Sequence, residues 1–207
     1  MVKAEAQVSE KKANVGVVTW PILEAGVIPL EGLLDMLHAL CHEVHVVTGG
    51  AARHIFVTDR PGVHLYLVKE NSTANTFVRV INNIRMQLGV SWGLAKVSKH
   101  VDFWIFFFGG PILLLPMLTA KLLRKGVVLN LVGSDVEDAK AQMGGLVSKV
   151  VSLLTKIDCR FSNRIIVYSG SLIKEWGLEK CQGKICIAHR DFLDFNKFKM
   201  QKALSKR

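Results

Sequence analysis

Three short glycine-containing segments of this sequence have the residue types of a ligand site. They contain Gly26, Gly109, Gly110, Gly133, Ser134 and Asp135. Each follows a short apolar run. Glycine lets ligand atoms come close to the backbone, and N–H groups at the start of a helix favour anions such as phosphate. Asp135 can accept hydrogen bonds from ligand hydroxyls or cap the helix that follows it, and ordinary turns remain the alternative for the glycines.

Histidine, cysteine and serine patterns give weaker indications of chemistry. His38, His42 and His45 are close in sequence, but they straddle a predicted helix end, a turn and a strand, so we do not expect them to converge on a metal. Cys181 and Cys186 flank a turn and have no histidine beside them. The serines near residue 170 do not form the G-x-S-x-G motif of hydrolases. We therefore predict no metal and no cofactor, and no catalytic residue can be named.

Short apolar segments predict the strands that position these loops. The predicted strands cover residues 14–20, 43–48, 63–68, 102–108, 127–132, 164–168 and 184–188. Several of them are apolar throughout, which is typical of parallel strands covered on both faces. Helical periodicity separates the strands, and this alternation predicts an α/β fold with a doubly wound, Rossmann-like parallel sheet. Ligands of such sheets bind at the carboxyl ends of the strands, where the three glycine segments lie.

Apolar residues at helical spacing predict the helices. They cover residues 30–40, 75–98, 112–124, 145–157 and 171–176. Residues 21–29 are predicted to form a loop that carries Gly26, and Gly89 or Gly93 could break the second helix. Residues 103–123 are long and apolar enough to imitate a membrane span, but Gly109, Gly110 and Pro111 favour a strand, a turn and a buried helix instead.

Composition indicates a folded domain with a preference for anionic partners. Of its 207 residues, 50% are hydrophobic and 21% are charged, and the formal net charge is +10. No zinc-finger spacing or aromatic RNA-binding signature is present, so nucleic acid is disfavoured as a partner. Four cysteines without a C-x-x-C pair, and a polar start without a signal sequence, predict free thiols in the cytoplasm.

Four segments resemble family-4 glycosyltransferases, in the order in which that family has them. LDMLHALCHEVHVVT, residues 34–48, is similar to the family's second helix and strand, with Cys41 in place of its usual glycine. Gly133-Ser134-Asp135-Val136 resembles a His-Gly-Ser-Asp-Val loop, with Val132 in place of the histidine. NRIIVYSGSLIKEWGL and KICIAHRDFLDFNKF are similar to two later segments, and Lys184, Asp194 and Phe198 match fixed points of the second.

The resemblance implies the N-terminal, acceptor-side domain of a retaining, metal-independent GT-B glycosyltransferase. We expect a disordered extension over residues 1–13, this domain over 14–195, and a basic linker over 196–207 that leads to a donor-binding domain missing from the chain. Such an enzyme transfers a hexose from a nucleotide sugar to a sugar or lipid-linked acceptor. The family's loop at Gly26 approaches the donor phosphates. We expect the chain alone to be inactive.

Two alternatives remain open at this stage. The chain could be a non-catalytic carbohydrate- or anion-binding α/β module, or a regulatory domain of another family. The region 71–100 has four basic and no acidic residues, and Lys121, Arg124 and Lys125 add to the basic surface. This surface is either a solvated helix face or a peripheral docking site for anionic lipid headgroups.

Overall fold

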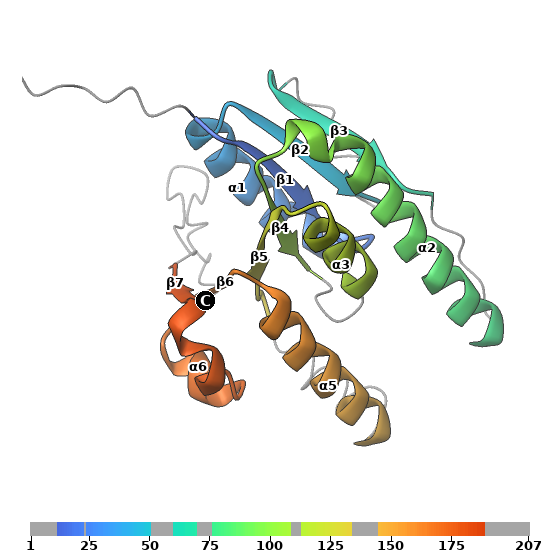
Figure 1. Cartoon of the computed structure of the whole chain (residues 1–207), viewed down its shortest axis with the longest axis vertical. Helices are drawn as coiled ribbons and strands as arrows, with labels where there is room; N and C mark the ends of the chain where they lie inside the picture. Colours follow the sequence, from blue (N-terminus) through green and yellow to red (C-terminus); the bar gives the residue numbers. More distant parts are fainter. Residues whose placement is uncertain are drawn as a thin grey trace, which may run out of the picture.

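The fold is an α/β sandwich around one parallel sheet. The computed structural model describes residues 12–22, 24–50, 60–69, 76–108, 113–133 and 145–188. Seven strands pair in the order β3-β2-β1-β4-β5-β6-β7, and every pairing is parallel. Helices cover the sheet on both faces (Figure 1). The predicted Rossmann-like fold class is confirmed.

All seven predicted strands are present, most with slightly shorter bounds. They are β1 (Asn14–Val18), β2 (Glu43–Thr48), β3 (Val63–Leu67), β4 (Phe103–Phe107), β5 (Gly126–Asn130), β6 (Arg164–Val167) and β7 (Ile185–Ile187). The apolar, β-branched and aromatic composition of these runs suits a sheet buried on both faces. As expected, β4 is the central strand, and four of its five residues are buried.

The helices are close to the predicted ones. They are α1 (Glu24–Leu40), α2 (Thr76–Val97), α3 (Leu114–Leu122), α5 (Gly145–Phe161) and α6 (Ser171–Glu175), with short 3₁₀ helices at Ser98–His100 and Glu179–Lys184. The loop predicted over residues 21–29 is wrong, because α1 begins at Glu24 and contains Pro29. Proline removes one backbone donor, and here it lies near the start of the helix, where little of the hydrogen-bond ladder precedes it.

Two apolar layers hold the sheet and helices together. One packs α2, α3 and Cys159 of α5 against one face of the sheet, and it includes the buried Trp104 and Phe106. The other packs Leu30, Leu34 and Leu37 of α1 against the opposite face. Because alternate residues of a strand point to opposite faces, β4 supplies side chains to both layers. No helix in these described ranges has the length and hydropathy needed to cross a bilayer.

Helix α2 runs unbroken over the sheet, so neither of its glycines ends it. A Cβ at Gly89 would lie 3.1 Å from Val68 Cγ1, and one at Gly93 would lie 3.3 Å from Val47 Cγ1. Both distances are shorter than ordinary carbon–carbon contacts. The two glycines therefore allow α2 to approach the strands closely, which the sequence pattern alone did not distinguish from a helix break.

The predicted domain boundaries fall mostly on residues that the structure does not describe. Residues 1–11 and 189–207 lie outside the described ranges, and the predicted extension and linker stay predictions. The ordered elements from β1 to β7 lie within the predicted domain.

Candidate functional site at the carboxyl edge of the sheet

The order of the strands reverses between β1 and β4. From β1 the chain adds β2 and β3 on one side, and from β4 it adds β5, β6 and β7 on the other. The connections after β1 and β4 therefore diverge at the carboxyl edge, where open α/β sheets bind ligands. This position in the sheet, rather than any single residue, defines the candidate site (Figure 1).

The segments that follow β1 and β2 are fastened to each other. Thr19 Oγ1 and Thr48 Oγ1 are 2.5 Å apart and share a buried hydrogen bond. Ile22 and Gly50 form a parallel β-bridge. Gly50 has φ 66°, and a Cβ there would lie 2.6 Å from the carbonyl oxygen of Ile22, so only glycine fits this crossing. These contacts hold the loop after β1 and the loop after β2 together, so the two loops form one surface at the carboxyl edge of the sheet.

The end of β4 is hydrogen-bonded to the segment that follows β1. The N–H of Trp20 donates to the carbonyl oxygen of Phe108 at 3.3 Å. Phe108 has φ 58°, a left-handed conformation that costs a non-glycine residue about 1–2 kcal/mol. Its ring packs edge-on against Phe107, with the ring centroids 4.4 Å apart. Strained backbone of this kind is often found at binding sites.

Gly26 lies in the first turn of α1 rather than in the predicted loop. A Cβ there would be 3.1 Å from Ile22 Cβ and 3.7 Å from Phe108 Cε2. Glycine at this position therefore lets the start of α1 pack against the ends of β1 and β4. The structure places Gly26 close to the ring of Phe108 at the end of β4, and this packing gives a structural reason for the residue type.

Gly133 follows β5, the strand next to β4. It is exposed, and a Cβ placed on it meets no atom of the described residues within 4 Å. Gly109, Gly110, Ser134 and Asp135 lie outside the described residues, so the predicted meeting of all three segments is not tested. The described residues bring together the segments that follow β1, β2 and β4.

The charge at the start of α1 distinguishes between kinds of ligand. Glu24 occupies the first helical turn, where a carboxylate interacts favourably with the helix dipole. The same carboxylate opposes a second anion such as a phosphate. The approach of donor phosphates to Gly26, which the family resemblance implies, stays a prediction, and Glu24 is the nearby charge that would oppose it.

Sequence reasoning missed Phe108 and Asn130. Asn130 ends β5 and is 7% exposed, and its Oδ1 has no hydrogen-bond partner among the described residues. A buried carbonyl oxygen without a partner costs about 1–3 kcal/mol, so it marks a place where a ligand or a neighbouring loop can donate. The polar residue inside the apolar run VVLNLV was the available signal. Nothing in the sequence indicates the backbone angle of Phe108.

The histidines considered for a metal do not meet. His38 and His42 are exposed, and neither converges with other metal-ligand side chains in the part of the chain that the structure describes. Within the described ranges, the ligand atoms that do converge are those of Glu43, His45 and His64, near the amino ends of β2 and β3. The four cysteines are free thiols, as predicted.

Comparison with solved structures supports the topological description. The chain is similar to LpCGTa in complex with UDP, with a TM-score of 0.63, 12% identity, and coverage of 88% of this chain and 55% of that one. It is similar to Anabaena Alr3699/HepE in complex with UDP and glucose, with a TM-score of 0.56, 9% identity, and coverage of 87% and 45%.

A third similar structure is the UDP-GlcNAc 2-epimerase from Methanocaldococcus jannaschii. Its TM-score is 0.56, its identity is 14%, and the coverage is 84% of this chain and 45% of the epimerase. No family model and no curated protein matches the sequence. The chain spans about half the length of the solved structures it matches. It has a Rossmann-like α/β fold, and the solved structures that it resembles include GT-B glycosyltransferases.

Proposed function

We propose that this chain is the acceptor-side half of a GT-B glycosyltransferase. In the complete enzyme it would present a hydroxyl acceptor to a nucleotide sugar held by a second domain, and a hexose would be transferred. The reaction forms a bond between the acceptor oxygen and the sugar's anomeric carbon, releases the nucleoside diphosphate, and passes the hydroxyl proton to a base.

The observation that carries this proposal is the switch point between β1 and β4. The segments after these strands are joined through Trp20 and Phe108, and Gly26 lies against the same place. The likeness to UDP-bound glycosyltransferases supports a sugar ligand at this position. The carboxylate of Glu24 favours the acceptor over the donor phosphates on this side of the cleft.

The proposal assigns the described and undescribed edge residues a common role. Gly26, Gly109, Gly110, Gly133, Ser134 and Asp135 would line the acceptor side of the cleft. Asn130 would add a buried carbonyl oxygen at the end of β5, able to accept from an acceptor hydroxyl or from the following loop. Asp135 would either bind the acceptor or cap the next helix, and the two roles differ in whether its removal costs binding or stability.

Transfer by the isolated half is not expected. Catalysis requires the donor and acceptor to be held together, and exclusion of water requires a closed cleft. Incubation of the chain with UDP-glucose and saccharides should release no UDP above the uncatalysed rate. Saccharide binding should be detectable by ligand-observed NMR. Steady UDP release by the chain alone would contradict the half-enzyme proposal, and absence of binding to any saccharide would contradict the acceptor role.

An anionic membrane surface is proposed as a second partner, because α2 carries an exposed apolar stripe. Ile84, Leu88 and Trp92 recur every four residues and are 50%, 57% and 68% exposed. Lys96 Nζ lies 5.7 Å from the centroid of the Trp92 ring. A purely solvated face, the other interpretation of this region, would be polar. Apolar and basic side chains on one surface helix suit an interface with anionic lipid.

Vesicle sedimentation tests this second partner. The chain should pellet with vesicles containing phosphatidylglycerol and remain in the supernatant with phosphatidylcholine alone. Trp92→Ser should weaken pelleting severalfold, whereas Gln182→Ser, an exposed change on the 3₁₀ helix before β7, should not. Equal pelleting of both variants would show that α2 is not the lipid-docking surface. Its exposed apolar stripe would then be assigned to contact with a protein partner.

A further inference from the structure

Glu43, His45 and His64 form a cluster at the amino half of the sheet, away from the candidate sugar site. Glu43 and His45 are two residues apart on β2, so their side chains leave the same face of the strand. His64 of β3 is paired directly with His45 in the parallel register. β2 and β3 lie side by side at one edge of the sheet (Figure 1). Strand pairing therefore gathers the three side chains.

The carboxylate of Glu43 lies between the two imidazoles. Its Oε2 is 3.3 Å from Nε2 of His45, and its Oε1 is 3.9 Å from Nε2 of His64. The two rings stack with centroids 4.8 Å apart. All three candidate ligand atoms lie within 4.8 Å of one another. Ligand atoms around a tetrahedral zinc ion are about 3.3 Å apart. Small side-chain rotations of the more exposed Glu43 and His64 would bring the three ligand atoms to this spacing.

His45 supplies an independent indication of a missing partner. Its side chain is 5% exposed, and Nε2 forms no hydrogen bond of good geometry among the described residues, although Glu43 Oε2 lies 3.3 Å from it, close enough for an ion pair when the ring is protonated. Nδ1 lies 3.3 Å from the hydroxyl oxygen of Tyr66. When Nδ1 carries the proton and donates to this hydroxyl, Nε2 presents a lone pair toward Glu43. Metal-binding histidines are oriented by a hydrogen bond of this kind.

The chemistry of these donors selects the ion. Two imidazole nitrogens and one carboxylate oxygen suit zinc and neighbouring transition metals, whereas magnesium and calcium prefer oxygen ligands alone. The partly exposed side chains of Glu43 and His64 leave a path for the ion and for a water ligand.

We propose that Glu43, His45 and His64 bind a divalent zinc ion, with water completing a four-coordinate site that links β2 to β3. The site is separate from sugar transfer, because it lies toward the amino ends of the strands and the acceptor edge lies at their carboxyl ends. Its predicted effect is on the stability of the edge strand β3, and it stands or fails independently of the proposed transferase.

Zinc titration of the metal-stripped, untagged chain against a chromophoric chelator tests the site. The chain should bind one zinc ion with micromolar or tighter affinity, and zinc should raise its melting temperature. His64→Gln and Glu43→Gln each change a partly exposed ligand and should weaken binding at least about tenfold, as loss of even an outer-shell partner does. His42→Gln changes an exposed histidine outside the cluster and should bind zinc like the parent.

Cobalt absorption separates this site from binding by thiols. A cobalt complex of the chain should show the visible bands of a four-coordinate nitrogen and oxygen site. No saturable zinc binding would overturn the proposal. Zinc binding that His64→Gln and Glu43→Gln leave unchanged, or an ultraviolet cobalt–thiolate band in the stoichiometric complex, would overturn it as well.

Discussion

At the scale of single residues, Gly16 has no room for a larger side chain in the sheet. It lies in β1 beside Trp104 of β4, and a Cβ added to it would collide with the indole ring of Trp104. The indole is fully buried, and its Nε1 donates to Ser98 Oγ at 3.2 Å. The ring therefore has little freedom to move, and the small residue on β1 and the large one on β4 form one packing unit.

Gly16→Ala should lower the free energy of unfolding by about 3 kcal/mol, the upper end for overpacking a core. Urea denaturation measures the loss. Gly32→Ala is the matched control: Gly32 lies exposed in α1, and a Cβ there meets nothing within 4 Å. This control should gain about 0.5–1 kcal/mol from helix propensity. Similar stability of the two variants would show that Trp104 does not cover Gly16.

The cysteines should differ in reactivity because they differ in burial. Burial raises the pKa of the Cys159 thiol to about 12, with further increases from Cys181 and Asp158. At pH 8 its reactive thiolate is therefore scarce as well as inaccessible. Iodoacetamide should modify the exposed Cys186 and leave Cys159 unmodified until the chain unfolds, as peptide mass spectrometry can determine. Equal native labelling of both would contradict the placement of Cys159.

At the scale of elements, α3 ends in a Schellman motif built on a non-glycine residue. Arg124 N–H donates to Lys121 O at 2.9 Å, and Lys125 N–H donates to Ala120 O at 2.9 Å. Arg124 accordingly has φ 57°, where glycine is the usual residue. The helix end predicted at residue 124 lies close to the observed end at Leu122, but the sequence pattern did not indicate the left-handed conformation of Arg124.

Arg124→Gly should raise the free energy of unfolding by about 0.5–1 kcal/mol, because the relief of left-handed strain exceeds glycine's entropy cost. Arg124→Ala removes the same charge but keeps a Cβ, so it should change stability little. Thermal unfolding of both variants gives the comparison. A gain of equal size in both would assign the effect to charge and not to backbone conformation.

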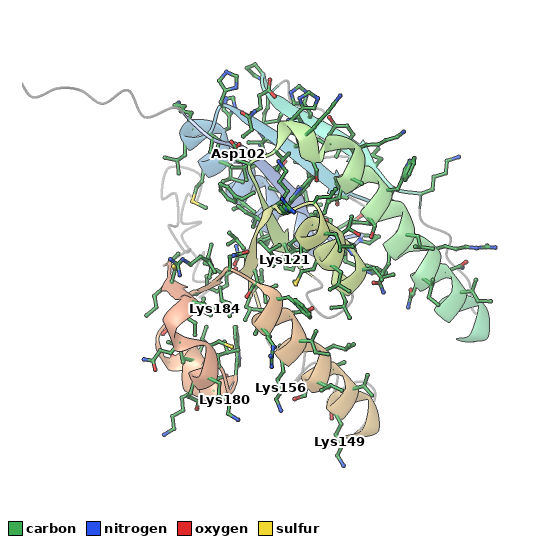
Figure 2. The ribbon with its side chains drawn as sticks, in the orientation of Figure 1. Asp102, Lys121, Lys149, Lys156, Lys180 and Lys184 are labelled. Atoms are coloured by element: carbon green, nitrogen blue, oxygen red, sulfur yellow. The ribbon has the colours of Figure 1, made fainter. Side chains whose placement is uncertain are left out.

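Lys184 closes the C-terminal end of α5. Its Nζ donates to the carbonyl oxygens of Cys159, Arg160 and Ser162 at 3.3, 2.8 and 2.9 Å. Its label in Figure 2 lies beside the C-terminal elements, while Lys149 and Lys156 project from α5 itself. The family resemblance marks Lys184 as a fixed position, and the structure gives it this structural task.

Lys184→Met should cost about 1–2 kcal/mol, since it removes charge-assisted hydrogen bonds to carbonyl oxygens at and just beyond the C-terminal end of α5. Lys180→Met changes an exposed lysine of the same 3₁₀ helix and should stay within about 0.5 kcal/mol of the parent. Guanidinium unfolding would distinguish them. If the two substitutions cost the same, the capping contacts contribute nothing measurable.

At the scale of the whole molecule, the pattern of strands and helices was predictable, and the contacts at the site were not. Continuous apolar runs such as FWIFF mark parallel strands locally, so the sheet followed from sequence. The sequence prediction missed the first six residues of α1, because a proline such as Pro29 usually marks the end of a loop at the start of a helix. The pairing of His45 with His64 depends on strand register, and the crossing of Gly50 with Ile22 depends on two loops that are distant in sequence.

The central claim is that the carboxyl edge at the β1–β4 switch point binds a saccharide acceptor. Gly133 and Gly183 offer a matched pair, because both are exposed and an added Cβ at either meets no atom of the described residues within 4 Å. Gly133 follows β5 at the carboxyl ends of the strands, whereas Gly183 precedes β7 at their amino ends. A tryptophan at Gly133 would obstruct the acceptor edge. The same side chain at Gly183, just before β7, would not.

The most direct measurement is a saccharide titration of the ¹⁵N-labelled chain, followed by amide chemical shifts. In the parent and in Gly183→Trp, the shifts should be confined to the segments around Trp20, Gly26, Phe108 and Gly133. Gly133→Trp should weaken the binding at least about tenfold, a loss of about 1.4 kcal/mol. Shifts centred on another part of the molecule, or equal binding by both tryptophan variants, would contradict the account.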